Sequence, residues 1–461
     1  MSLAQLRAAP LGAWTRFREH HSRALATVLT TAVIAYVAWK IFQSPSQALQ
    51  FAFNGLPVGA VYALLAMGFT LVYSTVWFFD LYYGAAAALG AYGVFYLRSQ
   101  DFLGGRYDVN NHFVNIAFAL VVAGVVAWAL HVNFHSRLRT RLSPTALRAV
   151  GGAPSLAIGV YMWLVLANPN QLNAMLSPVI GALVAAVAFW LLHRGYGRLA
   201  DNSRPISVLA LAPPAAALGS YCGFLVAATP DANLYLSWGV SCVLAGAVSL
   251  ALYRGLYVYM RLRAKSPLIM LVASLGILLA ITAITTIIFR AAPRPLPEAF
   301  GSDVWTVAGA NIKGFNVFAI GVAMAGFAGL LLLLKKTAFG TAVRAIGDDE
   351  EVSKVVGINT TVVIAVVFFI GAIFAALAGI LSGHDTAIQP RMGLLLLLKG
   401  WIASVIGGIG NLHGAIIGGF ALGMIEQFGI WDLAGEWKDV ISFVVLIVFL
   451  SFWPQGLLPR R

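Results

Sequence analysis

Polar and ionisable side chains inside long apolar stretches are the residues of this sequence that could do chemistry. Asp80 closes one such stretch, and Lys399 lies in a glycine-rich one. Because ionisable groups at membrane depth are costly, they usually face a cavity or a partner group. Neutral hydroxyl and amide groups on the same stretches could extend a polar pathway by hydrogen bonding. The candidates for such a pathway are Tyr62, Thr70, Tyr73, Asp80, Tyr83, Ser274, Lys399, Ser404 and Asn411.

Each candidate also has a purely structural interpretation. Asp80 could be an acid at an interfacial turn, and Lys399 could extend its ammonium group to the membrane surface. Singly, the neutral residues could serve only to pack helices. Glu426 could face the inner wall of the glycine-rich stretch or its outer boundary.

The sequence lacks the motifs of common catalytic sites. It contains no GxxxxGK[ST] phosphate loop, no HExxH, and no GxSxG between a strand and a helix. The eight histidines are scattered, and Cys222 and Cys242 have no metal-ligand spacing. We therefore expect no enzyme, no cofactor and no metal site.

The composition indicates a membrane protein. Of the 461 residues, 60% are hydrophobic and only 10% are charged, against roughly 25% charged in soluble domains. This excludes a soluble globular protein and a disordered chain. The long apolar runs predict an all-α polytopic membrane protein with about 12 transmembrane spans. They lie at 25–42, 49–75, 80–97, 113–134, 149–167, 175–193, 206–229, 236–260, 267–289, 315–334, 361–383 and 438–453.

The net charge of +13 serves as an orientation signal. About two thirds of the 30 Lys and Arg residues fall on one side when the apolar runs alternate across the membrane. Cytoplasmic loops carry such an excess, so we expect both termini in the cytoplasm and no nucleic-acid partner. This orientation requires the glycine-rich stretch 393–428 to enter and leave the membrane on the same side, as a re-entrant hairpin.

Glycines support that hairpin and suggest internal symmetry. Broken helices at membrane depth are tolerated when they are buried in protein or line a cavity. The stretches GAVYALLAMG at 59–68 and GAIIGGFALG at 414–423 share two Gly and two Ala in register. Paired broken segments are typical of inverted-repeat transporters, although close helix packing through small residues explains the match nearly as well.

Residues 335–360, KKTAFGTAVRAIGDDEEVSKVVGINT, form the most polar loop. Acidic residues at a helix start are favourable in themselves, so the loop could be a solvated turn. Its length, amphipathic pattern and cytoplasmic position favour a docking surface for a soluble partner. The residues that could take part are Arg344, Gly347, Asp348, Asp349, Glu350, Glu351, Ser353 and Gly357.

Four collinear segments resemble the permeases of ABC transporters. GTAVRAIGDDEEVSKVVGINTTVVIAVVFFIGAIFAALAGIL at 340–381 is similar to their cytoplasmic coupling loop and the helix after it. NGLPVGAVYALLAMGFTLVYS at 54–74 and SPLIMLVASLGILLAI at 266–281 resemble core helices, and 392–419 with 437–458 resembles the C-terminal signature. The closest resemblance is to the branched-chain amino-acid permease family, which is related to the simple-sugar permeases.

The sequence departs from that family in two places. The family's turn after the first core helix usually carries His and Glu where this chain has Tyr83 and Ala85, which puts the substrate in question. Members are also typically shorter. We therefore expect four parts, namely a basic N-terminus with an extra span at 1–48, the first part of the core at 49–100, four inserted spans at 101–233, and the remaining core at 234–461.

The resemblance implies an inverted-repeat importer permease in the bacterial-type inner membrane. The solute would be a branched-chain amino acid or a related amide or urea-like molecule. ABC ATPase subunits would couple through 340–358, and a second permease, a solute-binding protein near His384 and Asp385, and lipid would be further partners. A stand-alone transporter or channel, a simple-sugar permease and a non-transporting scaffold remain alternatives.

Overall fold

The computed structural model describes residue 31 and residues 35–102, 110–138, 144–199, 211–229, 231–263, 267–297 and 303–458. Nearly all of them lie in helices, which confirms the predicted all-α class. One short β-hairpin interrupts the helices, formed by β1 (Val304–Val307) and β2 (Ala310–Lys313). Its two-residue turn holds Ala308 and Gly309 at φ values of 50° and 81°. Positive φ at both positions is typical of tight hairpin turns.

Fewer helices than predicted qualify as membrane spans. By length and hydropathy, seven described helices could cross a membrane, or eight if one bent pair forms a span. The sequence predicts about 12 spans. The apolar helices at Gly152–Ala167 and Ala212–Ala228 are shorter than the spans, and Tyr82–Phe102 is rich in Gly, Ala and Tyr. Half of the first predicted span, 25–42, lies outside the described residues.

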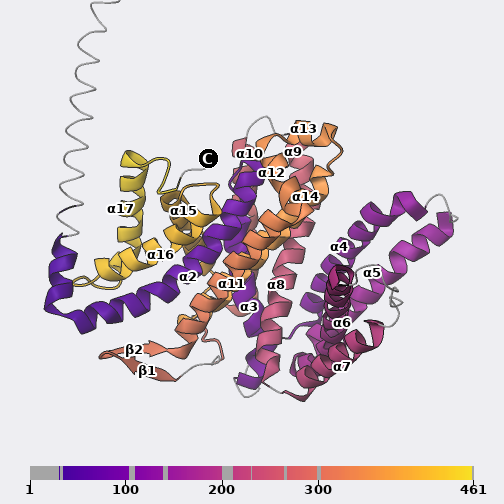
Figure 1. The fold of residues 1–461 in the computed structure, drawn as a ribbon, viewed down its shortest axis with the longest axis horizontal. Helices are drawn as coiled ribbons and strands as arrows, with labels where there is room; N and C mark the ends of the chain where they lie inside the picture. Colours follow the sequence, from indigo (N-terminus) through magenta and orange to yellow (C-terminus); the bar gives the residue numbers. More distant parts are fainter. Residues whose placement is uncertain are drawn as a thin grey trace, which may run out of the picture. The chain divides into compact units, whose positions relative to one another are not determined.

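The chain divides into two compact units, which we describe separately. The first unit comprises Met1–Phe79, Ala299–Val363 and Leu395–Arg461. Besides the β-hairpin and most of α15 (Met392–Gly407), it contains α2 (Pro45–Val76), α11 (Gly314–Lys336), α12 (Ala338–Asp348), α13 (Glu350–Val355), α16 (Leu412–Gly429) and α17 (Trp437–Phe452) (Figure 1).

The second unit comprises Asp80–Glu298 and Ile364–Leu394. Its elements are α3 (Tyr82–Phe102), α4 (His112–Leu138), α5 (Pro144–Ala167), η1 (Pro169–Gln171), α6 (Leu172–Leu199), α7 (Ala212–Ala228), α8 (Ala232–Leu252), the π-helix η3 (Tyr253–Tyr257), α9 (Val258–Arg263), α10 (Pro267–Phe289) and nearly all of α14 (Thr360–Asp385).

The first unit is organised around α2 and α16, which pack without bulky side chains between them. A Cβ placed on Gly423 would come within 2.5 Å of the Gly59 Cα, and one on Gly419 would come within 2.4 Å of the Ala63 Cα. The two helices run antiparallel, because the residue numbers of the contacting residues increase along α2 as they decrease along α16. The glycine-rich stretches that suggested internal symmetry therefore pack directly against each other. Their inverted-repeat relationship remains a prediction.

The glycine-rich stretch 393–428 forms the two helices α15 and α16, which bend by 117° at the break between them. Gly408 and Gly410 make this break with φ values of 107° and 87°. The C-terminal segment closes it, since the backbone N–H of Leu457 donates to Ile406 O and that of Leu458 donates to Gly407 O. A helix pair with this bend is either a broken span or a re-entrant loop, and the re-entrant hairpin stays a prediction.

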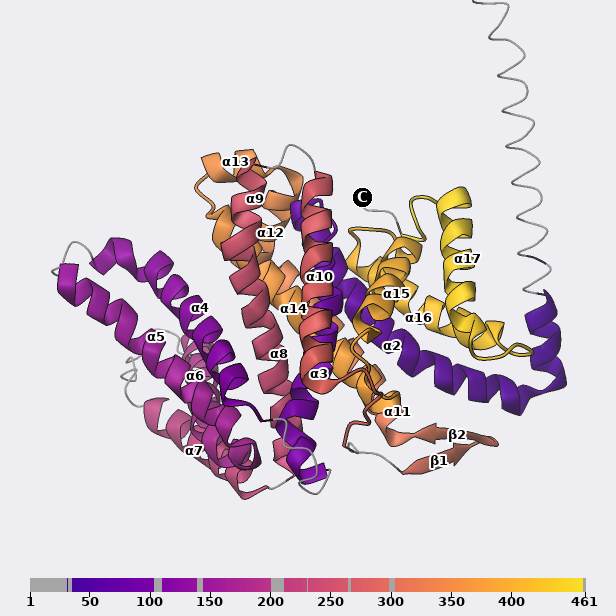
Figure 2. The ribbon, with the colours of Figure 1, turned by 180° about the vertical axis from the view of Figure 1, so that it is seen from behind.

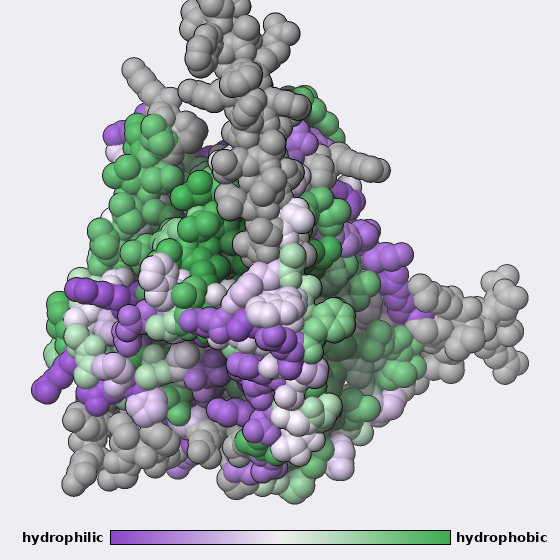
Figure 3. Space-filling view, turned by 90° about the vertical axis from the view of Figure 1, so that its left-hand side faces the viewer, coloured by the Kyte–Doolittle hydropathy of each residue, from purple (hydrophilic) through white to green (hydrophobic). Residues whose placement is uncertain are grey.

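The outward surface of the first unit suits a bilayer. Figure 3 shows broad areas of hydrophobic residues (green) on this face and a band of hydrophilic residues (purple) below the middle. On α17, the exposed large side chains are apolar: Trp437, Val440, Phe443, Val444, Ile447 and Leu450. Exposure of such side chains to water is unfavourable, so a lipid environment suits this helix.

In the second unit, α4–α7 form two helix pairs beside α8 (Figures 1 and 2). α4 packs against α5 and α6 against α7, and a cluster of buried residues links them to the rest of the unit. That cluster consists of Tyr96, Leu97, Val165, Leu166, Leu172, Val240 and Leu244. Among its described residues, the predicted insertion 101–233 thus contains the four α-helices α4–α7, while its boundaries remain predictions.

Candidate functional site

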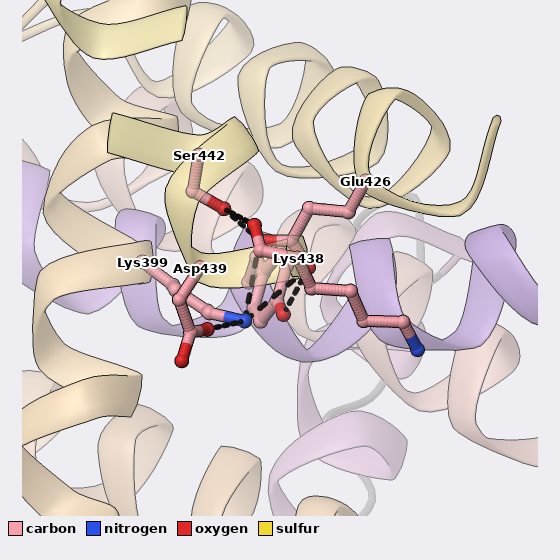
Figure 4. A network of polar contacts seen from close by, with 6 residues as sticks. Lys399, Glu426, Lys438, Asp439 and Ser442 are labelled. Atoms are coloured by element: carbon pink, nitrogen blue, oxygen red, sulfur yellow. Dashed lines mark hydrogen bonds and ion pairs between the residues drawn. The ribbon is translucent and has the colours of Figure 1, made fainter. Parts of the chain in front are cut away.

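A polar network inside the first unit joins α2, α15, α16 and α17. Glu426 of α16 is fully buried, and the Lys399 ammonium lies 3.3 Å from its Oε1. Tyr62 Oη donates to Glu426 Oε2 at 2.7 Å, and the hydroxyl of Ser442 donates to Oε1. Lys399 Nζ also lies 2.9 Å from Asp439 Oδ1. Figure 4 shows the Lys399 ammonium between Asp439 and Glu426, and the Ser442 hydroxyl directed at Glu426.

The electrostatics of this network are those of a shielded ion pair. The side chain of Lys399 is only 15% exposed, whereas that of Asp439 is 46% exposed. The ammonium also lies 5.4 Å from the Tyr62 ring centroid, which adds a cation–π contact. Because both Glu426 oxygens receive hydrogen bonds, the buried carboxylate is paired as burial of a charge requires.

A second polar contact links α2 and α15 closer to the hairpin break. The hydroxyls of Thr70 and Ser404 lie 2.7 Å apart, and both residues are buried. Between the two contacts, a Cβ on Gly400 would come within 2.5 Å of the Leu65 Cβ. The residue numbers of the contacting residues increase together along α2 and α15, so the two helices run parallel. The structure therefore brings together Tyr62, Thr70, Lys399 and Ser404 along one seam.

Sequence reasoning missed part of this network. It gives Glu426 no partner, and it does not name Asp439 or Ser442. The available signal was one cation and one anion in neighbouring apolar segments, since Lys399 and Glu426 could neutralise each other. Asp439 and Ser442 lie on one face of α17, and their spacing could have indicated that both belong to the network.

Two other predicted pathway residues of the first unit have different surroundings. Tyr73 belongs to an aromatic cluster, with its ring centroid 5.1 Å from that of Phe79 and 5.9 Å from that of Trp77. Asn411 caps α16, where its side-chain oxygen accepts from His413 N and Gly414 N. Its amide nitrogen donates to Leu458 O at 3.1 Å. Asn411 thus holds the hairpin break.

In the second unit, Asp80 is a buried carboxyl at the start of α3. Its Oδ1 accepts from the backbone N–H of Tyr82 at 3.0 Å and from Tyr257 Oη at 2.7 Å. Burial raises the pKa of Asp80 to about 6, and its two hydrogen bonds oppose that rise. Tyr257 ends the π-helix η3, and π-helical turns occur frequently at functional sites.

Ser274 supports the same turn, because the backbone N–H of Leu81 donates to its Oγ at 3.2 Å. Tyr83 points elsewhere. A Cβ on Gly371 of α14 would come within 2.3 Å of Tyr83 Oη, so this ring packs against α14. Its hydroxyl is buried and finds no hydrogen-bond partner in the part of the chain that the structure describes. Asp80 and Ser274 thus share a site that Tyr83 adjoins.

The polar loop 335–360 folds into α12 and α13. Thr337 caps α12 by accepting from Gly340 N, and Asp349 caps α13 by accepting from the backbone N–H groups of Glu351 and Val352. Glu350 forms an i,i+4 ion pair with Lys354 at 3.1 Å. Among the predicted docking residues, Asp349 is therefore a cap.

Four further docking candidates have defined places in this loop. The Arg344 guanidinium donates to Leu334 O at the end of α11. Ser353 is buried, and its hydroxyl donates to Asp349 O. Gly357 ends α13 with a φ of 91°, and Gly347 O accepts from Trp77 Nε1 at 3.1 Å. Asp348 is exposed.

Large apolar side chains lie on the surface of α13 and its C-cap. Val352 is 58% exposed, Val355 88% and Val356 75%. Neighbouring Glu351 is also exposed, so the patch combines apolar and acidic groups. Exposed valines at the end of a polar loop point to a protein contact, because this segment is not long enough to cross a membrane.

No group of three or more potential metal ligands occurs among the described residues. The sequence model of one protein family, described as "Branched-chain amino acid transport system / permease component", matches residues 214–450. This is more than half of the chain. The chain is a permease of this family. As a family member it is the permease subunit of an ABC importer in the inner membrane.

Named relatives agree with this family. The high-affinity branched-chain amino acid transport system permease protein LivH of Salmonella typhimurium is 32% identical to the permease over 255 residues, 53% of this chain and 82% of that protein. BraD of Pseudomonas aeruginosa, with the same description, is 36% identical over 172 residues, 37% of this chain and 56% of BraD. The xylose transport system permease protein XylH of Escherichia coli is 30% identical over 141 residues, 29% of this chain and 35% of XylH. No solved structure matches the chain.

Proposed function

We propose that this permease imports branched-chain amino acids. The observation that carries the proposal is the similarity to LivH, which extends over 82% of that relative. Amides and urea-like solutes are further candidates from the family resemblance, and Tyr83 and Ala85, in place of the His and Glu of the family's turn, leave the choice of substrate open. A sugar substrate is the second candidate, supported by the shorter similarity to XylH, which covers 35% of that protein.

The proposed solute pathway uses the polar residues of both units. In the first unit it follows the seam of Tyr62, Thr70, Lys399 and Ser404, with Tyr73 and Asn411 towards the hairpin break. In the second unit it includes Asp80, Tyr83 and Ser274. The support for this assignment is that, within each unit, buried hydroxyl and ionic groups lie between packed helices. Burying such groups at membrane depth costs free energy, so they usually serve a polar route.

The proposed energy source is ATP hydrolysis on separate subunits that dock on α12 and α13. The exposed valines of α13 would enter the interface, and Arg344, Gly347, Asp348, Asp349, Glu350, Glu351, Ser353 and Gly357 would shape its surface. The hydrogen bond from Trp77 to Gly347 connects this surface to the end of α2. Movement of the docked subunit would therefore reach a helix of the proposed pathway.

The proposed assembly contains a second related permease, a solute-binding protein and bilayer lipid, with no nucleic acid. Both termini would lie in the cytoplasm, with the binding protein on the opposite side near His384 and Asp385. Residues 1–48 and 101–233 would be additions to a permease core formed by 49–100 and 234–461. Proximity of His384 to Trp238, with ring centroids 5.0 Å apart, fixes the outer end of α14 against α8.

Uptake into proteoliposomes tests the substrate. The permease, its ATPase subunits and its binding protein are reconstituted, and uptake of radiolabelled leucine, urea and xylose is compared with and without ATP. We expect ATP-dependent leucine uptake. ATP-dependent xylose uptake alone would support the second candidate. Uptake without ATP indicates a stand-alone transporter, and no uptake of any solute indicates a scaffold.

Docking is tested with Val355→Asp. Burying an unpaired carboxylate in the interface should weaken ATPase association by several kcal/mol, so transport and transport-coupled ATP hydrolysis should fall together. Val304→Asp on β1 is the matched control, because this valine is 54% exposed and lies outside the loop. Normal co-purification of the ATPase with Val355→Asp would exclude α13 from the interface.

A further inference from the structure

A cavity of about 270 Å³ lies inside the second unit, between α3, α4, α8 and α10. α8 packs on both α3 and α4, and α10 packs on α3, so the cavity lies within one group of packed helices. Its lining is almost entirely aliphatic and aromatic, with Val114 and Phe118 on α4, Val248 on α8, and Ile281 and Phe289 on α10. A cavity with such walls suits an apolar ligand better than water.

Two buried hydroxyl groups lie in these apolar walls. Tyr92 on α3 and Ser241 on α8 are each 1% exposed, and both line the cavity. Neither Tyr92 Oη nor Ser241 Oγ finds a hydrogen-bond partner among the described residues. Both oxygen atoms are enclosed by protein and add almost nothing to the surface of the cavity, so the cavity suits an apolar ligand.

The cavity is open towards the hydrocarbon surface of the protein. Ile284 lines it and is nevertheless 54% exposed. Next to it, Ile287 of α10 is 80% exposed, and Phe113 at the start of α4 is 83% exposed. α10 is one of the helices long and apolar enough to cross a membrane. A ligand that enters here must therefore come from the bilayer.

The polar end of such a ligand should lie near the end of α10. The Tyr92 ring centroid is 4.7 Å from that of Phe289, the last residue of α10. Below this level the lining runs from Ile288 back to Ile281, which at about 1.5 Å per helical residue is on the order of 10 Å. A volume of about 270 Å³ corresponds to roughly nine water-sized groups of about 30 Å³ each, which methylene groups resemble in size.

We propose that this cavity binds one acyl chain of a bilayer phospholipid. The chain fills the apolar space, and the headgroup stays near the end of α10. Val114, Phe118 and Leu166 belong to helices of the predicted insertion, while the other walls come from α3, α8 and α10. The bound lipid therefore stabilises the packing of the additional helices against the remainder of this unit.

Photo-crosslinking tests the site in the full-length protein. Membrane vesicles that contain the permease receive phosphatidylethanolamine with a diazirine in the middle of one acyl chain, and labelled peptides are mapped after illumination. We expect labels on cavity walls such as Leu89, Val248 and Ile281. In Ile284→Trp the larger side chain obstructs the opening, and wall labelling should fall on the order of tenfold, the effect of about 1.4 kcal/mol.

Leu279→Trp is the matched control, since this residue of α10 is 56% exposed and does not line the cavity. Its labelling should equal that of the wild type. Ile281→Trp, which fills the cavity from inside, replaces Ile284→Trp if that variant fails to fold. Equal labelling in the wild type and a folded filling variant would overturn the proposal.

The source of the acyl chain needs a separate test. A parallel experiment uses a free fatty acid with the same diazirine. Wall labelling by the fatty acid with none by the phospholipid would overturn the phospholipid assignment, as would labels confined to the outer surface of α10.

Discussion

At the residue scale, the Glu426 carboxylate is enclosed by protein, and the Lys399 ammonium is its paired charge. Removal of one partner of a buried ion pair leaves an uncompensated charge and costs about 3–5 kcal/mol. We expect Lys399→Met to lower the thermal unfolding midpoint in detergent strongly. The double variant Lys399→Met/Glu426→Leu should recover much of the loss, since it removes both charges.

Asp439→Asn is the control for this experiment, because Asp439 is half exposed and surface ion pairs contribute about 0–1 kcal/mol. It should leave the midpoint nearly unchanged. If Lys399→Met is as stable as the wild type, Glu426 has another source of compensation and the network is not an ion pair. If leucine uptake falls in variants of normal stability, the network belongs to the solute pathway.

Asp80 gives a prediction on pH. Its pKa of about 6 in the folded protein exceeds the value of about 3.9 for an unperturbed aspartate. The folded state therefore takes up a proton first as the pH falls, and stability rises between about pH 7 and 4. Two pKa units correspond to about 3 kcal/mol, and this is the largest gain we expect.

Asp80→Asn should abolish that gain and should be more stable than the wild type near neutral pH. The amide oxygen can still accept from Tyr82 N and Tyr257 Oη. Unfolding midpoints across the pH range measure the difference, with Asp439→Asn as the comparison that retains the wild-type profile. Parallel profiles for Asp80→Asn and the wild type would contradict the proposed protonation of Asp80.

The sequence indicated most polar residues of the seam but could not pair them. Hydroxyls and a lysine inside apolar runs are recognisable one by one. Tyr62 and Glu426 are 364 positions apart, and Thr70 and Ser404 are 334 apart. No local periodicity reports such a contact. The role of Asn411 as a cap was hidden for a different reason, since the hairpin break that needs it is a tertiary feature.

At the element scale, the packing of α2 on α16 depends on glycines. A Cβ on Gly423 would come within 2.4 Å of Gly59 N and 2.6 Å of Gly55 O, both backbone atoms that cannot rotate away. Gly423→Ala should destabilise the protein by about 1–3 kcal/mol, as overpacking does. Calorimetry in detergent measures this loss.

Gly329→Ala on α11 is the control, because nothing lies within 4 Å of its added Cβ. Alanine is the better helix former by about 1 kcal/mol, so this variant should be as stable as the wild type or more so. Equal stability of Gly423→Ala and Gly329→Ala would show that α2 and α16 have room to separate.

The break between α15 and α16 was predictable as an element. A cluster of glycines at 400–423 predicts a broken helix pair, and the position of both its ends on one side of the membrane stays a prediction. Apolar length alone predicts more spans than the seven or eight helices that qualify among the described residues, because helices such as α7 (Ala212–Ala228) have the apolar composition of a span at a shorter length. The hairpin of β1 and β2 escaped detection since its strands have only four residues each.

At the scale of the whole molecule, orientation follows from α11. This helix begins directly after β2 and reaches α12 within two residues of its end. With 23 residues at about 1.5 Å each it is about 35 Å long, enough for one crossing. The β-hairpin and α13 must then lie on opposite sides of the membrane, and the basic loops favour α13 in the cytoplasm.

Cysteine labelling tests this orientation in a variant whose Cys222 and Cys242 are replaced by serine. Val355→Cys at an 88% exposed position and Trp305→Cys at a 55% exposed position are treated with a membrane-impermeant maleimide. In right-side-out vesicles we expect Trp305→Cys to react and Val355→Cys to stay unlabelled until the membrane is opened. Inside-out vesicles should reverse the result. Labelling of both positions from the same side would show that α11 does not cross. The opposite pattern would place the docking surface outside the cell, where no ATPase could reach it.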